Sequence, residues 1–371
     1  MSSIRLGQKV FLLMKVIAFN IVLIAMIVVA TELIFGGWII KENNFSRACL
    51  YLLCGTEYEF HGEFTGKTRY TIDKFGLRGR KSDDSDIDMV VVGGSTTDQR
   101  YNDNTETWDQ LLEDKFNKSG RSVEIVNAGI NGQTTFGHIW NFKYWFPYIP
   151  NFSPKYIIFF IGFNDVPPKV SAEKYDFDVH TVKQQLRINS IFYEIYRIAR
   201  GMIWADQAKI GHNLYKGSGT YNVSFDIRKI DWTSYRNKYV NKQYVPRLKE
   251  LTRLSNQIGA EPIFVTQRSA RWAVKNGNIV GVGNPGEHAD LVLKYKGEEY
   301  VFSNADFGYA EKIISDATMY YCKEIGLNCF NGYEKMSINY KNTYDLVHTI
   351  KEGNEEIAEK LFVFLDTIIP N

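Results

Sequence analysis

Short apolar runs, each followed by turn residues, alternate along the chain with longer amphipathic segments. The amphipathic segments Thr107–Phe116, Tyr235–Gly259 and Asn354–Leu365 have helical spacing. Runs of four to six residues rich in Val, Ile and Phe are typical of strands buried on both faces of a parallel sheet. The alternation therefore predicts an α/β domain with a five-stranded parallel sheet. The predicted strands are residues 88–92, 123–127, 156–161, 261–266 and 327–330.

Glycine, hydroxyl and amide residues follow three of these predicted strands. A Gly-Gly-Ser-Thr-Thr turn places Ser95 after the first strand, and Gly132 lies in the segment after the second. A Gly-Phe-Asn-Asp turn places Asn164 after the third. Because open α/β sheets bind ligands at the carboxyl ends of their strands, we expect a functional site there.

A possible base for the Ser95 hydroxyl lies near the C-terminus, in the sequence Asp345-Leu346-Val347-His348. A serine becomes a nucleophile when a histidine takes its proton, and the histidine needs a carboxylate to orient it. The spacing of three residues lets one loop carry both the base and its orienter. We therefore predict Ser95 as the nucleophile, His348 as the general base and Asp345 as its partner.

Four motifs in this order resemble the signature blocks of the SGNH hydrolases, the GDSL-type esterase family. The blocks match Gly93-Gly94-Ser95, Gly132, the Gly-x-Asn-Asp motif that ends at Asp165, and the Asp-x-x-His motif that ends at His348. The resemblance covers about residues 88–365, with a lead-in at 70–79 found in some members. Gly94 stands where the family usually has Asp. This departure puts nothing catalytic in doubt, because that position is not part of the triad.

The resemblance implies a flavodoxin-like three-layer α/β/α fold and an acyl-enzyme mechanism. The oxyanion would be met by the backbone N–H groups of Ser95 and Gly132 and by the side-chain amide of Asn164. No cofactor and no metal is expected. Each motif alone has a simpler explanation: Ser95 could cap a helix, Gly132 could serve a positive φ, and a lone His348 could be structural.

Four further polar residues are left outside this predicted site. We expect Asp98, close to Ser95 in the sequence, to cap a helix or form an ion pair. His138 follows the second block and is the other histidine to examine. Arg268, with Arg271 just beyond the fourth predicted strand, could contact an anionic or hydroxyl-rich substrate, although solvated arginines are more common.

An apolar segment near the N-terminus, Val10–Phe35, is long enough to cross a bilayer. Arg5, Lys9 and Lys15 lie at its N-terminal end, so the positive-inside rule predicts a cytoplasmic N-terminus. The remaining chain would then be extracytoplasmic, or periplasmic in a Gram-negative envelope. A cleaved signal peptide is the alternative. We favour an uncleaved anchor, because the apolar stretch is long.

We expect residues 1–40 to form this anchor, 41–59 a linker and 60–371 the hydrolase domain. Insertions are expected at about 166–233 and 268–310, and insertions of this length often carry function. The first has apolar residues at helical spacing from Ile191 to Trp204. It could be a substrate cap, a membrane-facing surface or additional packing. Cap or packing is favoured, because its polar face is mixed rather than basic.

The four cysteines form two close pairs, Cys49 with Cys54 and Cys322 with Cys329. An exported domain could oxidise them, but geometry has to decide between disulfides and free thiols. The net charge of +2 provides no broad electrostatic footprint for nucleic acid. Oligomeric state is not predicted.

These features favour a serine esterase that cleaves an acyl ester, most simply acetyl, on a cell-envelope carbohydrate. One alternative is an O-acyltransferase or lipid esterase that uses the same triad. A second, from a different class, is a non-catalytic glycan-binding subunit of an envelope assembly that kept the fold.

Overall fold

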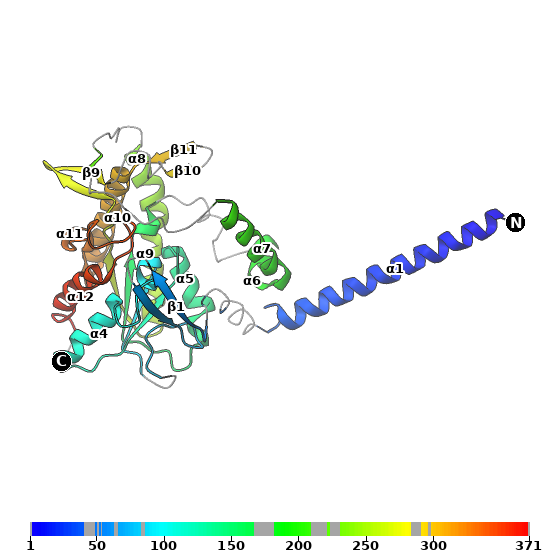
Figure 1. Ribbon diagram of the computed structural model, residues 1–371, viewed down its shortest axis with the longest axis horizontal. Coiled ribbons are helices and arrows are strands. Elements are labelled where there is room, and N and C mark those ends of the chain that lie inside the picture. The colour runs from blue at the N-terminus through cyan, green and yellow to red at the C-terminus, as the bar shows by residue number, and fades with distance from the viewer. Residues whose placement is uncertain are drawn as a thin grey trace. The chain divides into compact units, whose positions relative to one another are not determined.

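Five parallel strands form the central sheet of the computed structural model, and they match the five apolar runs (Figure 1). Across the sheet the order is β12-β7-β5-β3-β4. Counted from β4 in chain order this is 2-1-3-4-5, the flavodoxin-like arrangement, so the predicted fold class is confirmed. The strands are β3 (Met89–Gly93), β4 (Ile125–Gly129), β5 (Tyr156–Ile161), β7 (Glu261–Thr266) and β12 (Cys329–Phe330).

The structure describes most of the chain, and these residues divide into two units. Unit 1 comprises Met1–Ala48 and Phe177–Gly211, and unit 2 comprises Cys49–Asp176 and His212–Asn371. The described residues are 2–40, 49, 52, 54–62, 66–82, 86–166, 182–208, 221–222, 231–282, 291–295 and 298–369.

Helices cover both faces of the unit 2 sheet. On one face, α4 (Trp108–Lys118) and α12 (Lys351–Leu365) pack against each other, as Figure 1 shows, over alternate strand residues such as Met89 and Val91. On the other face, Phe159 contacts Phe142 of α5 (Thr135–Tyr144). The side chains of each strand alternate between the two faces, so both faces need an apolar cover.

The other described strands of unit 2 form smaller sheets. A β1–β2 hairpin precedes β3, and an antiparallel three-stranded sheet, β6-β9-β8, accompanies a β10–β11 hairpin. The bounds of these strands are β1 (Glu57–Gly62), β2 (Gly66–Thr71), β6 (Tyr221–Asn222), β8 (Trp272–Lys275), β9 (Asn278–Val282), β10 (Leu291–Tyr295) and β11 (Glu298–Phe302). The other described helices of this unit are α3 (Ser95–Asp98), η1 (Phe146–Tyr148), η2 (Phe163–Asp165), α8 (Trp232–Ser234), η5 (Tyr235–Tyr244), α9 (Val245–Gln257), α10 (Asn304–Ile325) and α11 (Gly332–Lys335).

The predicted helix 235–259 has an unexpected first part, because η5 is a π-helix that continues into α9. A π-helix has more residues per turn than an α-helix, so side chains spaced four and five apart share a face. Tyr235, Tyr239 and Tyr244 have that spacing, and all three are buried. The first two donate hydrogen bonds of 2.6 and 2.7 Å to the carbonyls of Val166 and Asp165, which follow β5.

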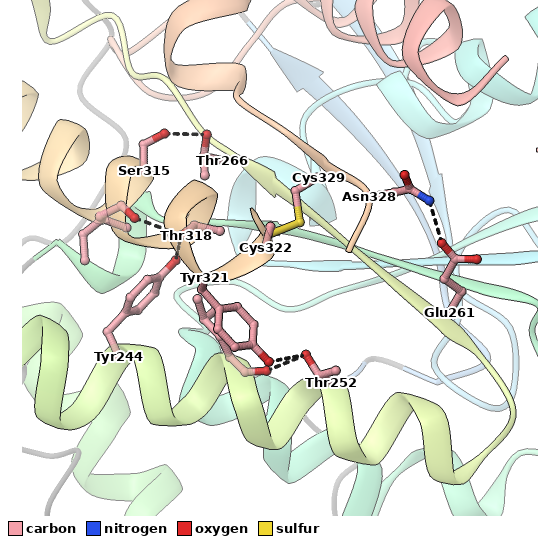
Figure 2. The surroundings of a disulfide bond; sticks show 12 residues. Tyr244, Thr252, Glu261, Thr266, Ser315, Thr318, Tyr321, Cys322, Asn328 and Cys329 are labelled. Atoms are coloured by element: carbon pink, nitrogen blue, oxygen red, sulfur yellow. Dashed lines mark hydrogen bonds between the residues drawn. A yellow bond between two sulfur atoms is a disulfide. The ribbon is translucent and has the colours of Figure 1, made fainter. Parts of the chain in front are cut away.

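Both cysteine pairs are disulfide-bonded, so no free cysteine remains in the chain. Figure 2 shows the bond from Cys322 of α10 to Cys329 of β12. Beside it, Tyr321 donates a hydrogen bond of 2.9 Å to Thr252 of α9. The disulfide thus closes the connection from α10 to the edge strand of the sheet.

Replacing both Cys322 and Cys329 by serine should lower the free energy of unfolding of unit 2 by about 2–3 kcal/mol, since the short loop gains chain entropy when unfolded. Denaturant unfolding of the full chain in detergent measures this. Reductant should destabilise the wild-type protein more than the double variant. An unchanged free energy of unfolding would contradict the prediction.

In unit 1, the longest helix is α1 (Ser2–Phe35). Its segment Phe11–Phe35 is long and apolar enough to cross a membrane, and none of that segment is buried. Such a helix near an N-terminus is a candidate membrane anchor or signal sequence. The unit also contains α6 (Val182–Asn189) and α7 (Ile191–Ala208).

Candidate active site

Ser95 begins α3 immediately after β3, separated from the strand only by Gly94. The neighbours of β3 in the sheet are β4 and β5, so the chain leaves β3 first toward one side and later toward the other. This reversal point is where doubly wound sheets open a crevice at their carboxyl ends. The fold therefore places Ser95 at the end of the sheet where doubly wound folds bind ligands.

Ser95, His348 and Asp345 form a continuous chain of hydrogen bonds. His348 Nε2 lies 2.7 Å from Ser95 Oγ, and His348 Nδ1 lies 2.7 Å from Asp345 Oδ2. A carboxylate can only accept, so Nδ1 carries the ring proton and Nε2 is free to accept the serine proton. Both the His348 and Asp345 side chains are mostly buried, with 12% and 10% of their surfaces exposed. The structure thus brings together the three residues predicted as a triad.

The turn from Asp345 to His348 is tightly bonded. Asp345 Oδ1 accepts from the backbone N–H groups of Val347 and His348, at 3.1 and 2.8 Å. Leu346 takes a positive φ of 67°, which is unfavourable for a residue with a side chain. Its carbonyl accepts a hydrogen bond of 2.8 Å from Ala270 N–H, which follows β7. The strained turn, which carries both Asp345 and His348, is therefore bonded to the segment that follows β7.

Tyr344 supports the imidazole from one side. The rings of Tyr344 and His348 stack, with centroids 5.5 Å apart and planes 13° from parallel. Burial, and next the negative charge of Asp345, raise the pKa of the Tyr344 hydroxyl. The phenol therefore stays neutral beside the imidazole and adds no charge that competes with Asp345.

Asn164 lies beside Gly94 and the loop after β4. Its Nδ2 donates a hydrogen bond of 3.0 Å to the carbonyl of Gln133. Gly132, the residue before, has a φ of +72°, which glycine adopts without strain. The structure therefore brings Ser95, Gly132 and Asn164 to neighbouring strand ends.

The close approach of Asn164 explains the glycine at position 94. A Cβ on Gly94 would lie 2.1 Å from Asn164 Nδ2 and 3.2 Å from the Gln133 carbonyl oxygen. Its φ of −88° and ψ of −151° are extended, so the limitation is steric and not conformational. In this chain the usual Asp of the first block would collide with the amide of the third.

Asp165, the next residue after Asn164, is fully buried and holds the start of α5. Its carboxylate accepts hydrogen bonds from the Thr135 hydroxyl at 2.7 Å and from Thr135 N–H at 3.2 Å. Arg247 of α9 lies 3.6 Å from the same carboxylate. These bonds, together with that from Tyr239 to the Asp165 carbonyl, fix the turn that carries Asn164.

His138 is a core residue of α5 and lies beneath the same loop. Its Nδ1 is 2.9 Å from Gln133 Oε1, and Gln133 Nε2 donates to Asn141 at 2.7 Å. Burial lowers the pKa of His138 to about 3. It is therefore neutral at physiological pH and supports Gln133, whose carbonyl accepts the bond from Asn164.

Because the unfolded chain has an ordinary histidine pKa near 6.5, it takes up a proton that folded His138 does not. The stability due to neutral His138 is complete above about pH 6.5 and falls as the pH drops toward 3. Between pH 7 and 5 this residue should lower the free energy of unfolding by about 2 kcal/mol. Denaturant titrations of wild type and His138→Asn at both pH values measure the difference. Equal pH dependence in the two proteins would refute it.

Gln99 links the serine turn to the histidine loop, a role that our sequence analysis missed. Gln99 ends α3 with a positive φ of 47°, and its Nε2 donates to Thr349 Oγ1 at 3.1 Å. Asn102 Nδ2 donates to the Thr349 carbonyl at the same distance. Thr349 directly follows His348, so these bonds set how far Ser95 lies from its base. No local pattern could have revealed them, because the partners are about 250 residues apart.

Arg78, in the lead-in before β3, holds the segment that follows α3. Its guanidinium donates hydrogen bonds of 2.7, 3.0 and 2.7 Å to the carbonyls of Asp98, Gln99 and Asn102. The Asp98 carboxylate accepts from Tyr70 OH at 2.6 Å and pairs with Arg100 at 3.3 Å. Asp98 thus forms an ion pair, one of the two roles expected for it.

The two candidate arginines beyond β7 have protein partners. Arg268 lies 3.9 Å from the Trp272 ring centroid and donates to the Tyr333 carbonyl at 3.2 Å. Arg271 donates to Asn304 at 3.1 Å, and its guanidinium lies 4.9 Å from the Phe307 ring centroid. Both arginines therefore have packing roles. No group of three or more His, Cys, Asp or Glu side chains that could hold a metal occurs in the described part of the chain.

Known structures show distant similarity to this chain. A GDSL-like lipase from Bacteroides thetaiotaomicron is 13% identical with a TM-score of 0.38, over 76% of this chain and 88% of that one. The esterase EstA from Pseudoalteromonas is 11% identical with a TM-score of 0.39, over 76% and 97%. The acetylxylan esterase Axe2 from Geobacillus stearothermophilus is 12% identical with a TM-score of 0.39, over 75% and 93%. None of these similarities is close enough to indicate a substrate.

Sequence comparison is more specific. No curated protein sequence matches the chain. The model of the GDSL-like lipase/acylhydrolase family matches residues 91–251, which include Ser95, Gly132 and Asn164. Asp345 and His348 lie beyond that match. The chain therefore carries a GDSL-like lipase/acylhydrolase domain, the domain of a carboxylic ester hydrolase.

Proposed function

We propose that this protein is a serine esterase that uses Ser95, His348 and Asp345 as its catalytic triad. The observation that carries the proposal is the unbroken chain of two 2.7 Å hydrogen bonds from the serine hydroxyl to the carboxylate. A structural serine or histidine needs no such chain. The position of Ser95 adds support, because it lies at the reversal point of the sheet, where folds of this type bind ligands.

In the proposed reaction, Ser95 Oγ attacks the ester carbonyl carbon while His348 Nε2 takes the hydroxyl proton. Asp345 holds the imidazole in the right tautomer and stabilises the imidazolium. The C–O bond of the ester then breaks, and His348 returns the proton to the leaving alcohol. Water attacks the acyl-enzyme by the same sequence and releases the acid and free Ser95.

Charge that develops on the carbonyl oxygen needs donors already in place. We assign this role to the backbone N–H groups of Ser95 and Gly132 and to the Asn164 side-chain amide. Support comes from the position of Asn164, whose amide lies against Gly94. The Asn164 amide is held there by its hydrogen bond to the Gln133 carbonyl and by the buried turn at Asp165. A donor that is fixed before the reaction stabilises the transition state without reorganisation.

For location, we propose that α1 is an uncleaved membrane anchor with its N-terminus in the cytoplasm. Arg5, Lys9 and Lys15 at its start support this orientation. The two disulfides support an oxidising compartment for the remaining chain. An extracytoplasmic esterase on a membrane anchor would act on the cell envelope, and we propose an acetyl ester of an envelope carbohydrate as its substrate.

The full chain in detergent, assayed on p-nitrophenyl acetate, butyrate and octanoate, tests this proposal. We expect acetate to be the best substrate and a serine-directed phosphonate to label Ser95. A preference for octanoate would indicate a lipid ester as the substrate in place of an acetylated carbohydrate. Acyl transfer to an added sugar in preference to water would indicate an acyltransferase. A folded protein that cleaves none of the three and resists the phosphonate would overturn the esterase proposal.

A further inference from the structure

Helix α7 has an apolar stripe that unit 1 does not cover. Phe192, Ile195 and Tyr196 are 41%, 54% and 55% exposed. Residues three and four apart lie on the same face of a helix, so these side chains form one continuous patch. Glu194, on another face of the helix, is buried. Single exposed apolar residues are ordinary, but a continuous exposed apolar stripe marks a surface that contacts a membrane, another protein or a ligand.

The beginning of α7 is bonded to the end of α1. The Glu32 carboxylate, in the last turn of α1, accepts from the Ser190 hydroxyl and from the backbone N–H groups of Ile191 and Phe192, at 3.2 and 3.4 Å. A carboxylate is well placed at a helix N-terminus, where N–H groups lack partners within the helix. A second link is the bond of 2.8 Å from Gly37 N–H to the Asn189 carbonyl.

These bonds place the start of α7 at the edge of the apolar segment. Glu32 lies three residues before Phe35, where the membrane-spanning candidate ends. Trp38, whose indole donates to Glu32 at 2.8 Å, is of a type enriched at membrane–water boundaries. If α1 spans the bilayer, the first turn of α7 therefore lies at the level of the lipid headgroups.

The charges near α7 suit that position. Residues 182–208 contain four basic and two acidic side chains, and α7 itself carries two of each. Arg200 lies over the ring of Tyr196, 5.9 Å from its centroid. Arginines next to an apolar stripe can rest their stems on it and extend their charge to phosphate groups. An interfacial helix combines these features: an apolar face with aromatics and nearby basic residues.

We propose that α7 lies on the bilayer surface, with Phe192, Ile195 and Tyr196 inserted at the boundary of headgroups and acyl chains. The inference rests on the anchor proposed above and does not depend on the hydrolase mechanism. It reverses our sequence-based preference for a cap or packing role. The reason is the Glu32 contact, which joins α7 to the apolar helix and which no local pattern reveals.

A fluorescent reporter of lipid contact can test this in the full chain. All four native cysteines are in disulfides, so an introduced cysteine is the one free thiol. Tyr196→Cys carries the label on α7. Tyr320→Cys is the matched control, an exposed tyrosine on α10 of unit 2. Each labelled protein is reconstituted in vesicles of phosphatidylcholine and phosphatidylglycerol at about 3:1, with and without lipids that carry a nitroxide high on the acyl chain.

We expect the nitroxide lipid to quench the label at position 196 at least severalfold more than the label at position 320. Absence of quenching at 196, or equal quenching at both positions, would overturn the proposal. Shielding of position 196 from aqueous iodide without lipid quenching would indicate a protein partner and would also overturn it. Hydrolysis of p-nitrophenyl acetate by the same samples keeps failure of the esterase proposal separate from failure of lipid contact.

Discussion

Ser95→Ala should lower kcat for p-nitrophenyl acetate by about 10⁴- to 10⁶-fold, the range found when a serine triad loses its nucleophile. Alanine leaves nothing to form the acyl-enzyme, and the donors near Asn164 retain only their residual effect. His348→Ala should have an effect of similar size, because an unassisted hydroxyl is a weak nucleophile. Initial rates over a range of substrate concentrations measure kcat and KM separately.

The triad should also behave as one unit. The Ser95→Ala, His348→Ala double variant should be no slower than either single variant, since each already removes the concerted step. Ser153→Ala is the matched control, because Ser153 is exposed and lies before β5, at the opposite end of the strands from Ser95. The kcat of this variant should equal that of the wild type. Retention of more than about a tenth of the wild-type kcat by folded Ser95→Ala would be incompatible with Ser95 as nucleophile.

Gly94→Ala should lower kcat by about 10²-fold, although it changes no residue of the proposed triad. The added methyl group would lie 2.1 Å from Asn164 Nδ2, well inside van der Waals contact. The amide is the flexible end of a side chain, so it can move aside, and one oxyanion donor is lost. Stability should change little for the same reason. Steady-state kinetics and thermal unfolding of the same sample separate the two effects.

A double-variant comparison identifies the cause of that loss. Asn164→Ala removes the donor directly and should lower kcat by about 10²- to 10³-fold. If Gly94→Ala acts by displacing Asn164, adding it to Asn164→Ala should cause almost no further loss. Independent, multiplicative losses would show that Gly94 acts by another route. An unchanged kcat in Gly94→Ala would contradict the assignment of the Asn164 amide as an oxyanion donor.

The strands and the candidate residue types were predictable from local sequence. An apolar run such as 156–161 is buried on both faces of the sheet wherever the chain places it, so its pattern is sufficient. Residues such as Ser95 and Asn164 could be singled out as candidates because a strand end is a local feature. The anchor candidate α1 was found for the same reason, since length and composition alone decide whether a helix can cross a bilayer.

Burial and pairing were not predictable in this way. His138 and His348 are the same residue type, yet one is neutral in the core with a pKa of about 3 and the other bonds Ser95. The cysteine pairs were open between thiols and disulfides until their geometry was known. Each of these properties depends on which atoms surround a side chain, and the amino-acid sequence around it does not specify them.

What belongs to the chain alone is therefore the alternation of strands and helices, the residue types at the strand ends and the apolar N-terminal segment. Only the tertiary structure decides the distance of 2.7 Å between Ser95 Oγ and His348 Nε2 and the close approach of Asn164 that requires glycine at position 94. It also decides the hydrogen bond from Gln99 to Thr349 and the hydrogen bond from the first turn of α7 to Glu32. The physical reason is range. Backbone preference and hydrophobic periodicity act over a few residues, whereas these contacts join segments from about 70 to 250 residues apart, and only packing of the whole core brings such segments within hydrogen-bonding distance.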